Sequence, residues 1–443
     1  MSSNRTTAPR PRRRGRVAIA VITSTGLLAA CSGGATGDGA GDEETVITCA
    51  SCQEGEDLFL QYNYDAAMRF NDEFAGRYRI ETIANQNAGA GPERLAYFQR
   101  LALADDLPDV FLASRQEMDV LLESAALFDF SAALDADPEW RDSYFEDSLA
   151  TLAREGAQYG LPEVRDSVGI YANRTILDAA GVEQFPQSWD ELELACDAVA
   201  ATGETCMAMD GDWVTLLMWA HLIETHPDGA GFLTDQVGAN DWAENPAVVA
   251  ATERLKDWHA RGFVNVDALA GDYANAATVY QTGRAAMIAN GPWMMGDIRG
   301  ASSIDGLGDA TTYEVSPGWD AANRGVISIT GGAWLSGSQS PAAQEATAAF
   351  MKFLASPDET FAQTIATGSY PPVRVELTSE QKEQLDPVIA ALVAEAATLD
   401  LVYPNVATNA SATFSDTWKN FWPAYVQGEM DTAQFLTRLT DEL

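Results

Sequence analysis

In Gly283-Arg-Ala-Ala-Met-Ile-Ala-Asn-Gly-Pro-Trp-Met-Met-Gly-Asp297, a short apolar run leads into a turn and then to a single tryptophan. The run Ala285 to Ala289 has the composition of a fully buried strand, and Asn290-Gly291-Pro292 is a turn sequence that ends it. Trp293 therefore stands where a helix begins, at the end of a strand. Its ring has two possible roles: a flat surface on which a ligand stacks, or an ordinary core contact.

The amino terminus predicts export. Residues 1 to 16 contain six Arg and no acid, and the apolar run from Val17 to Ala30 is shorter than the ~20 residues that span a bilayer. We therefore interpret residues 1–30 as a removable signal. Leu28-Ala-Ala-Cys31 resembles a lipobox, which implies a lipid on Cys31 and a protein held at the outer face of the cell membrane. A secretory signal with a chance cysteine is the alternative. Residues 31–44 have the Gly-rich composition of a flexible tether.

The net charge argues against nucleic acid and anionic lipid as partners, and the cysteines favour disulfide bonds. A net charge of −38 repels nucleic acid and anionic lipid. Four cysteines follow Cys31, an even number that favours disulfides in an exported chain. Cys196 and Cys206 are predicted to pair and to fasten a helix to the next segment. Cys49-Ala-Ser-Cys52 is predicted to form a structural bridge, with a redox pair or two zinc ligands as alternatives. We expect no metal and no cofactor.

Strand and helix patterns alternate along the chain. Thr45 to Thr48, Tyr78 to Ile83 and Asp109 to Ala113 are strand-like, and apolar residues at helical spacing lie between them. Ser340-Pro341 and Ser356-Pro357 each predict a helix start with proline in the first turn. The roughly 410 residues after the signal are too many for one core, so two α/β lobes are expected.

Several segments, in order, resemble the extracellular solute-binding proteins of bacterial ABC importers, in particular the maltose- and oligosaccharide-binding lipoproteins. They are Leu107-Pro-Asp-Val110, Tyr159-Gly-Leu-Pro162, Gly169-Ile-Tyr-Ala-Asn-Arg174, Ser188-Trp-Asp-Glu-Leu192, the segment quoted first, Gly331-Gly-Ala-Trp334, Phe350 to Pro357 and Gly368-Ser-Tyr-Pro-Pro-Val-Arg374. The resemblance covers nearly all of the mature chain. It implies a two-lobed, periplasmic-binding-protein-like α/β fold with discontinuous lobes joined by hinge crossings: 45–165 plus 314–356, and 166–313 plus 357–443.

The resemblance also implies a function. A monomeric, lipid-anchored receptor would bind a sugar or oligosaccharide between its lobes and deliver it to the permease subunits of an ABC transporter. Sugars suit such a cleft because their C–H faces stack on aromatic rings and their hydroxyls need polar partners once water is removed.

Candidate ligand contacts follow from the same resemblance. Trp293 matches a stacking tryptophan that follows Asn-Gly-Pro, and Asp166 matches a carboxylate that accepts hydrogen bonds from sugar hydroxyls. Other candidates lie in loops that the family uses for polar or aromatic contacts: Gln53, Glu54, Arg115, Gln116, Trp213, Trp334, Tyr370, Arg374 and Trp418. The structural alternatives are a hinge acid for Asp166, a helix N-terminus for Arg115 and Gln116, and core packing for Trp334.

Two other functions stay open from the sequence. A secreted glycoside hydrolase would need two carboxylates facing across one glycosidic bond, which a sequence cannot exclude. Arg115, Arg165 and Arg374 could instead hold an anionic solute such as a glycerol phosphate, because a guanidinium group matches carboxylate and phosphate geometry. The ordered family pattern favours a binding protein over an enzyme.

Overall fold

The computed structural model describes residues 44–55, 57–83, 92–124, 127–236, 242–396, 398–399, 401–406 and 414–441. Internal contacts divide the chain into Met1–Asp42 and Glu43–Leu443, and the described helices and strands lie in the second unit. The predicted signal and Cys31 lie outside the described residues. Within the described ranges, no helix is both long and apolar enough to cross a membrane.

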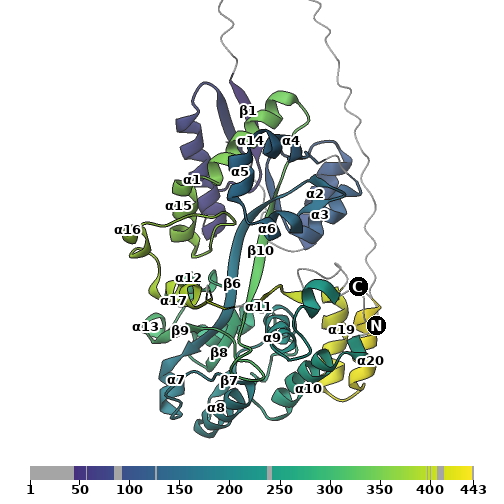
Figure 1. Cartoon of the computed structure of the whole chain (residues 1–443), viewed down its shortest axis with the longest axis vertical. Helices are drawn as coiled ribbons and strands as arrows, with labels where there is room; N and C mark the ends of the chain where they lie inside the picture. Colours follow the sequence, from purple (N-terminus) through teal and green to yellow (C-terminus); the bar gives the residue numbers. More distant parts are fainter. Residues whose placement is uncertain are drawn as a thin grey trace, which may run out of the picture. The chain divides into compact units, whose positions relative to one another are not determined.

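Two long antiparallel strands form the spine of this unit. They are β6 (Leu161–Asn173) and β10 (Val326–Leu335), paired from Ile327–Val168 to Trp334–Leu161. Figure 1 shows them side by side between two groups of elements, which we call the first and second lobes. Three strands extend the sheet in the second lobe beside β6, namely β8 (Ala285–Asn290), β9 (Thr311–Glu314) and β7 (Thr205–Met207). The last residues of β10 pair with β3 (Phe111–Ala113) in the first lobe. The first residues of β10 pair with β11 (Val402–Tyr403).

The first lobe surrounds the parallel pair β1 (Thr45–Cys49) and β2 (Tyr78–Thr82). Ile47, Phe70, Ile80 and Phe350 are buried together in its core. Its other elements are α1 (Leu58–Glu73), α2 (Pro92–Leu103), α3 (Arg115–Leu122), α4 (Ser131–Ala136), α5 (Pro138–Ser143), α6 (Glu146–Thr151), the hairpin β4 (Ala153–Arg154) and β5 (Ala157–Gln158), and α14 (Pro341–Leu354).

The second lobe is built around α9 (Trp213–Glu224), whose residues from Val214 onward are all buried. A helix that is apolar on every side must lie inside the lobe, and α9 belongs to one buried apolar cluster with Trp189, Trp258 and Trp422. Its other elements are α7 (Arg174–Ala179), α8 (Trp189–Thr202), η1 (Phe232–Gln236), η2 (Trp242–Glu244), α10 (Pro246–Ala260), α11 (Tyr273–Gln281), α12 (Met294–Arg299), α13 (Leu307–Ala310), α17 (Pro387–Ala396), α19 (Phe414–Val426) and α20 (Thr432–Thr440).

Two further helices follow α14, namely α15 (Pro357–Thr367) and α16 (Ser379–Lys382). Arg69 of α1 pairs with Glu359 of α15 at 2.7 Å, and the Tyr62 hydroxyl donates to the Glu359 carbonyl. The boundary expected after residue 356 would place α15 in the second lobe, whereas these contacts join it to the first. The limits of the lobes stay a prediction.

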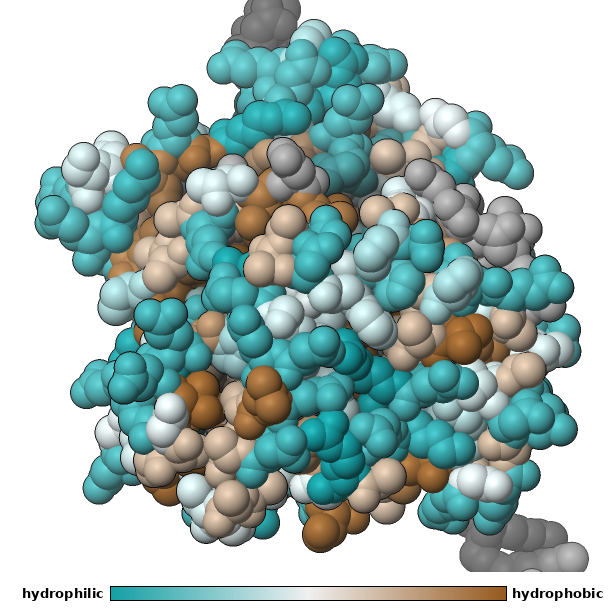
Figure 2. Space-filling model, turned by 60° about the horizontal axis from the view of Figure 1, so that its bottom comes forward, coloured by the Kyte–Doolittle hydropathy of each residue, from teal (hydrophilic) through white to brown (hydrophobic). Residues whose placement is uncertain are grey.

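Both predicted disulfides are formed, Cys49 with Cys52 and Cys196 with Cys206. The second joins α8 to β7 across the turn at Gly203, whose φ of +92° is the left-handed conformation that glycine tolerates. On the face shown in Figure 2 hydrophilic residues predominate, and hydrophobic residues appear in small, separate groups. Such scattered groups are ordinary on a protein surface.

Candidate functional site

The loop after β3 presents the first pair of candidates. Ser114 caps α3 by accepting a hydrogen bond from the Glu117 amide, and the Glu117 carboxylate accepts from the Ser114 amide at 2.6 Å. Glu117 also forms an ion pair with Arg94 of α2. This reciprocal cap fixes the start of the helix, and therefore the positions of Arg115 and Gln116.

A cavity of about 560 Å³ brings these residues together with the second lobe. Arg115 and Gln116 line it from the first lobe, and Trp213 and Thr234 line it from the second. The remaining lining residues are Ser114, Asp147, Ala150, Thr151, Ser328 to Gly332, and Val402 to Pro404. Three of the residues predicted from the sequence therefore lie around one cavity.

The second glycine of the Gly331-Gly332 motif, which lies beside this cavity, is required by the backbone. Its φ is +64°, and a Cβ there would lie 2.2 Å from Glu163 Oε2. Only glycine meets both conditions without strain, so the motif lets β10 pass close to the Glu163 side chain of β6.

Trp213 borders a second cavity of about 530 Å³, which Asp210, Asp212, Tyr273 and Lys419 also line. Asp210 is fully buried, and one of its oxygens accepts from the backbone N–H groups of Asp212, Val214 and Thr215 at 3.0 to 3.2 Å. These bonds fix the start of α9, where Trp213 is the first residue. Burial raises the pKa of Asp210 to about 6. Trp219, six residues further along α9, is buried in the core.

The Trp293 turn lies near the start of α1. Trp293 is partly buried, and a Cβ on Gly291 would lie 2.0 Å from its ring, so the turn needs glycine there. A Cβ on Gly296, one turn into α12, would lie 3.0 Å from Leu58 Cδ1 of α1. The tryptophan turn and the β1–α1 loop, which carries Gln53 and exposed Glu54, thus come from different lobes to neighbouring positions. A ligand contact of Trp293, Gln53 or Glu54 stays a prediction.

Asp166 does not have the position expected of a ligand contact. Its side chain is 1% exposed, and its two oxygens accept from the Ser369 hydroxyl at 2.9 Å and the Tyr370 amide at 2.7 Å. Its burial and these two bonds favour the structural alternative, and a ligand contact of Asp166 stays a prediction. The alternative fits: Asp166 holds β6 to the segment that follows α15. Burial raises its pKa to about 7.

A pH-dependent stability difference follows for Asp166→Asn. An unfolded aspartate titrates near pH 3.9, so between about pH 4 and 7 the folded wild type holds a proton that the unfolded chain releases. The stability due to this group is complete below pH 4 and is lost as the pH rises through 7. Asn does not titrate: its Oδ1 can accept from the Tyr370 amide, and its Nδ2 can donate to the Ser369 hydroxyl oxygen, which then accepts in place of donating. We expect the variant to gain on the order of 1–3 kcal/mol relative to wild type between pH 4 and 8.

Urea unfolding at several pH values measures this difference. Burial raises the pKa of Glu163 to about 8, and the Asp166 charge adds to this rise, so Glu163 contributes a slope of the same sign to both proteins and a smaller one in the variant. The comparison is therefore repeated in a Glu163→Gln background, where this contribution is absent from both proteins. A stability difference that does not change with pH would contradict the assignment.

Two predicted tryptophans are core residues. Trp334 is 5% exposed and packs against Phe350, with 6.3 Å between ring centroids, inside the first lobe. Trp418 is fully buried in the second lobe between Trp219 and Trp422, at 5.0 and 4.8 Å. Their burial favours core packing, the alternative stated for Trp334, and a ligand contact of either ring stays a prediction.

Tyr370 and Arg374 line a different cavity, of about 630 Å³, with largely apolar walls. The Arg374 guanidinium donates to the carbonyls of Asp142 and Tyr144 and lies 4.9 Å from the Phe145 ring. These two residues are therefore not brought together with Arg115 and Trp213.

The sequence reasoning missed several cavity residues. Ser328 and Thr330 alternate with apolar neighbours on β10, a period of two that could have indicated one polar face of this strand. Val402, Tyr403 and Pro404 also line the cavity, but this segment is far in sequence from the other lining residues, so no local signal connects it with them. Among the described residues, no three His, Cys, Asp or Glu side chains are grouped so as to hold a metal ion.

Comparisons with known proteins agree with this architecture. The family model described as bacterial extracellular solute-binding protein matches residues 66–391. A chitin oligosaccharide binding protein is 20% identical, with a TM-score of 0.72 over 90% of this chain and 98% of the other. Maltose-bound MalE3 of T. maritima is 19% identical, with a TM-score of 0.69 and the same coverage. These TM-scores show a shared fold, and the predicted two-lobed α/β fold is confirmed.

A match to a curated relative covers a smaller part of the chain. The xylose/arabinose-binding protein XacG of Haloferax volcanii is 24% identical over 194 residues, which are 41% of this chain and 40% of the relative. The chain thus spans about two fifths of the length of the curated relatives that it matches.

Proposed function

We propose that this chain, which belongs to the bacterial extracellular solute-binding proteins, binds a sugar or oligosaccharide in the cavity between Arg115, Gln116 and Trp213. The observation that carries the proposal is the cavity itself. It combines an aromatic ring from one lobe with polar side chains from the other, and its volume of about 560 Å³ is within the ~300–1,000 Å³ usual for small-molecule sites.

The chemistry of this cavity suits a sugar. The Trp213 ring offers an apolar face to the C–H groups of a pyranose, and Arg115, Gln116, Ser328 and Thr330 can pair with its hydroxyls. The names of similar proteins support the same ligand class, since they specify chitin oligosaccharide, maltose and xylose or arabinose. The family is one of binding proteins, so we do not retain a glycoside hydrolase.

The anionic-solute alternative is less well supported. Of the three arginines that the sequence suggested for it, Arg115 lines the cavity, while Arg165 is paired with Asp147 at 2.9 Å and Arg374 bonds backbone carbonyls. The adjoining cavity carries Asp210 and Asp212, of which Asp212 is paired with Lys419 at 2.7 Å. A carboxylate or phosphate group that reached this cavity would lie near the Asp210 carboxyl group, which has like charge when it is ionised. We therefore propose a neutral ligand.

Anchoring and delivery complete the proposal. The sequence Leu28-Ala-Ala-Cys31 supports a lipid on Cys31 that holds the receptor at the outer face of the membrane. Membership of the family supports an ABC permease as the partner that receives the ligand. Closure of two lobes around a ligand would let the permease distinguish a loaded receptor from an empty one.

A thermal-shift screen tests the ligand class. The chain that begins after Cys31 is heated with xylose, maltose, raffinose and chitin oligosaccharides, and with glycerol phosphate and a uronate. A ligand that binds the folded state stabilises it by about 2.7 kcal/mol at 100 times Kd. We expect a rise in Tm with at least one neutral sugar, which chromatography recovers intact. A rise confined to the anionic compounds would contradict the proposal, and cleavage of a glycan would restore the hydrolase.

A further inference from the structure

Asn63 is a polar residue on the buried face of α1. It lies on the same face as Ala66, Ala67 and Phe70, and all four residues are 0% exposed. Neither its Oδ1 nor its Nδ2 has a hydrogen-bond partner among the described residues. A buried amide group without a partner costs free energy, because folding has removed its bonds to water. An apolar residue would avoid this cost, so the amide at this position indicates a polar partner.

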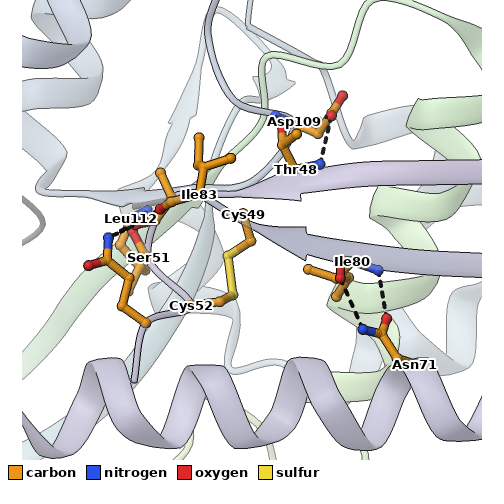
Figure 3. Close-up of a disulfide and its surroundings, with 11 residues drawn as sticks. Thr48, Cys49, Ser51, Cys52, Asn71, Ile80, Ile83, Asp109 and Leu112 are labelled. Atoms are coloured by element: carbon orange, nitrogen blue, oxygen red, sulfur yellow. Dashed lines mark hydrogen bonds between the residues drawn. A yellow bond between two sulfur atoms is a disulfide. The ribbon is translucent and has the colours of Figure 1, made fainter. Parts of the chain in front are cut away.

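A second asparagine of the same helix is fully paired. Asn71 Nδ2 donates to the Ile80 carbonyl at 2.9 Å, and Asn71 Oδ1 accepts from the Ile80 amide at 2.6 Å (Figure 3). These two bonds fasten α1 to β2. Because the two asparagines differ in their bonds and share one helix, Asn71 is a matched control for Asn63.

Glu163 of β6 presents another unpaired atom beside Asn63. Its Oε1 is buried and has no hydrogen-bond partner within the described ranges, whereas its Oε2 would lie 2.2 Å from a Cβ on Gly332. Burial raises the pKa of this carboxyl group, and the neighbouring Asn63 side chain partly offsets the rise. The two side chains are therefore close to each other, although no direct hydrogen bond joins them in the described structure.

A small cavity of about 20 Å³ lies beside these two side chains. Asn63 of α1, Glu163 of β6 and Thr360 of α15 line it, and its walls also include Trp334 and Leu354. A buried site holds one water molecule when it has at least about 10–15 Å³ and two to four polar partners. This cavity meets both conditions, and it is far smaller than the ~300 Å³ of the smallest usual small-molecule sites.

The polar groups around this cavity need a molecule that both donates and accepts hydrogen bonds. Asn63 Nδ2 is a donor and Asn63 Oδ1 an acceptor, and Glu163 Oε1 accepts when it is ionised and can donate when it is protonated. The Thr360 hydroxyl donates to the Ser356 carbonyl at 2.9 Å, so its oxygen is left to accept a second bond. A cation would face the Nδ2 hydrogens, and an anion would face the carboxyl oxygen. Water can pair with all of these groups.

We propose that this cavity binds one water molecule, which bridges Asn63 of α1 and Glu163 of β6, with Thr360 of α15 as the third partner. This inference goes beyond the proposed function and does not depend on it. The water joins a helix of the first lobe to the long strand that runs into the second lobe. It also holds Glu163 behind Gly332, which lines the cavity proposed for the sugar.

A high-resolution crystal structure of the full chain tests the site directly. We expect an isolated peak of electron density within about 2.5–3.2 Å of both Asn63 Nδ2 and Glu163 Oε1. A direct hydrogen bond between Asn63 and Glu163 without such a peak overturns the inference. A peak surrounded by oxygen atoms at about 2.0–2.6 Å would identify a metal ion and overturns it as well.

Magnetic relaxation dispersion of the water signal tests the site in solution, because it counts water molecules that stay bound while the protein tumbles. Asn63→Leu removes two polar partners and fills the cavity with a larger side chain, so we expect one bound water fewer than in wild type. Glu163→Gln should retain the wild-type number, because its amide still offers a partner. An undiminished count in Asn63→Leu overturns the inference.

Asn71→Leu is the control for this count. We expect it to keep the wild-type number of bound waters, although the loss of its two bonds to Ile80 lowers its melting temperature. If Asn63→Leu and Asn71→Leu both lose one water, the loss is not specific to this cavity and the inference is overturned. If Asn63→Leu does not fold, the electron density of the wild type decides alone.

Discussion

Trp213→Ala should weaken sugar binding about 100-fold and leave the fold intact. Trp213 lines both the cavity that carries Arg115 and the cavity that carries Asp210, and it is the largest aromatic residue that lines either of them. Removing an aromatic residue at the centre of a binding site commonly costs about 2 kcal/mol or more, and about 2.7 kcal/mol corresponds to 100-fold. The backbone at this position is held by buried Asp210 and not by the ring, so α9 keeps its start.

Trp319→Ala is the matched control for this prediction. Trp319 is also partly buried in the second lobe, but it lines neither cavity; its Nε1 donates to the Leu222 carbonyl and Arg254 stacks on its ring at 4.3 Å. We expect this variant to lower Tm with affinity within twofold of wild type. Titration calorimetry and thermal melting on both variants separate the two effects. If Trp213→Ala binds sugar with wild-type affinity, the cavity lined by Arg115, Gln116 and Trp213 is not the binding site.

Local features were predictable from the sequence because they depend on neighbouring residues. The apolar run from Ala285 to Ala289 is β8, which extends one residue further to Asn290, and all six residues are buried. Ser340 and Ser356 cap their helices with proline in the first turn, as the sequence indicated. In each case a strand period, a turn or a cap is complete within a few residues.

The direction in which a side chain faces was not predictable in the same way. Trp334 follows the Gly331-Gly332 motif and Trp418 follows the start of α19, and in each case a single strand or helix has both a core face and an open face. Which face is covered depends on partners in other elements, Phe350 of α14 for Trp334 and Trp219 of α9 for Trp418. Asp166 shows the same limit, because the Ser369 and Tyr370 groups that occupy its oxygens are more than 200 residues away.

Removal of the Cys196–Cys206 disulfide should mainly lower stability. The bridge fastens α8 to β7 in the second lobe, and both cysteines are fully buried beside Trp189, Leu192 and Val199 in one apolar cluster. Its ring spans ten positions in sequence, for which the loss of unfolded-state entropy is about 2–3 kcal/mol. We expect Cys196→Ala/Cys206→Ala to melt several degrees below wild type.

We expect the melting temperature to fall without a loss of ligand affinity, because neither cysteine lines a cavity that carries Trp213. Scanning calorimetry measures the melting temperature, and mass spectrometry after alkylation under non-reducing conditions verifies that wild type has no free thiol at these positions. Labelling of Cys196 and Cys206 in native wild type would disprove the pairing. An unchanged melting temperature would mean that the apolar contacts of α8 and β7 hold the lobe without the bridge. The Cys196–Cys206 disulfide would then need an explanation other than stability.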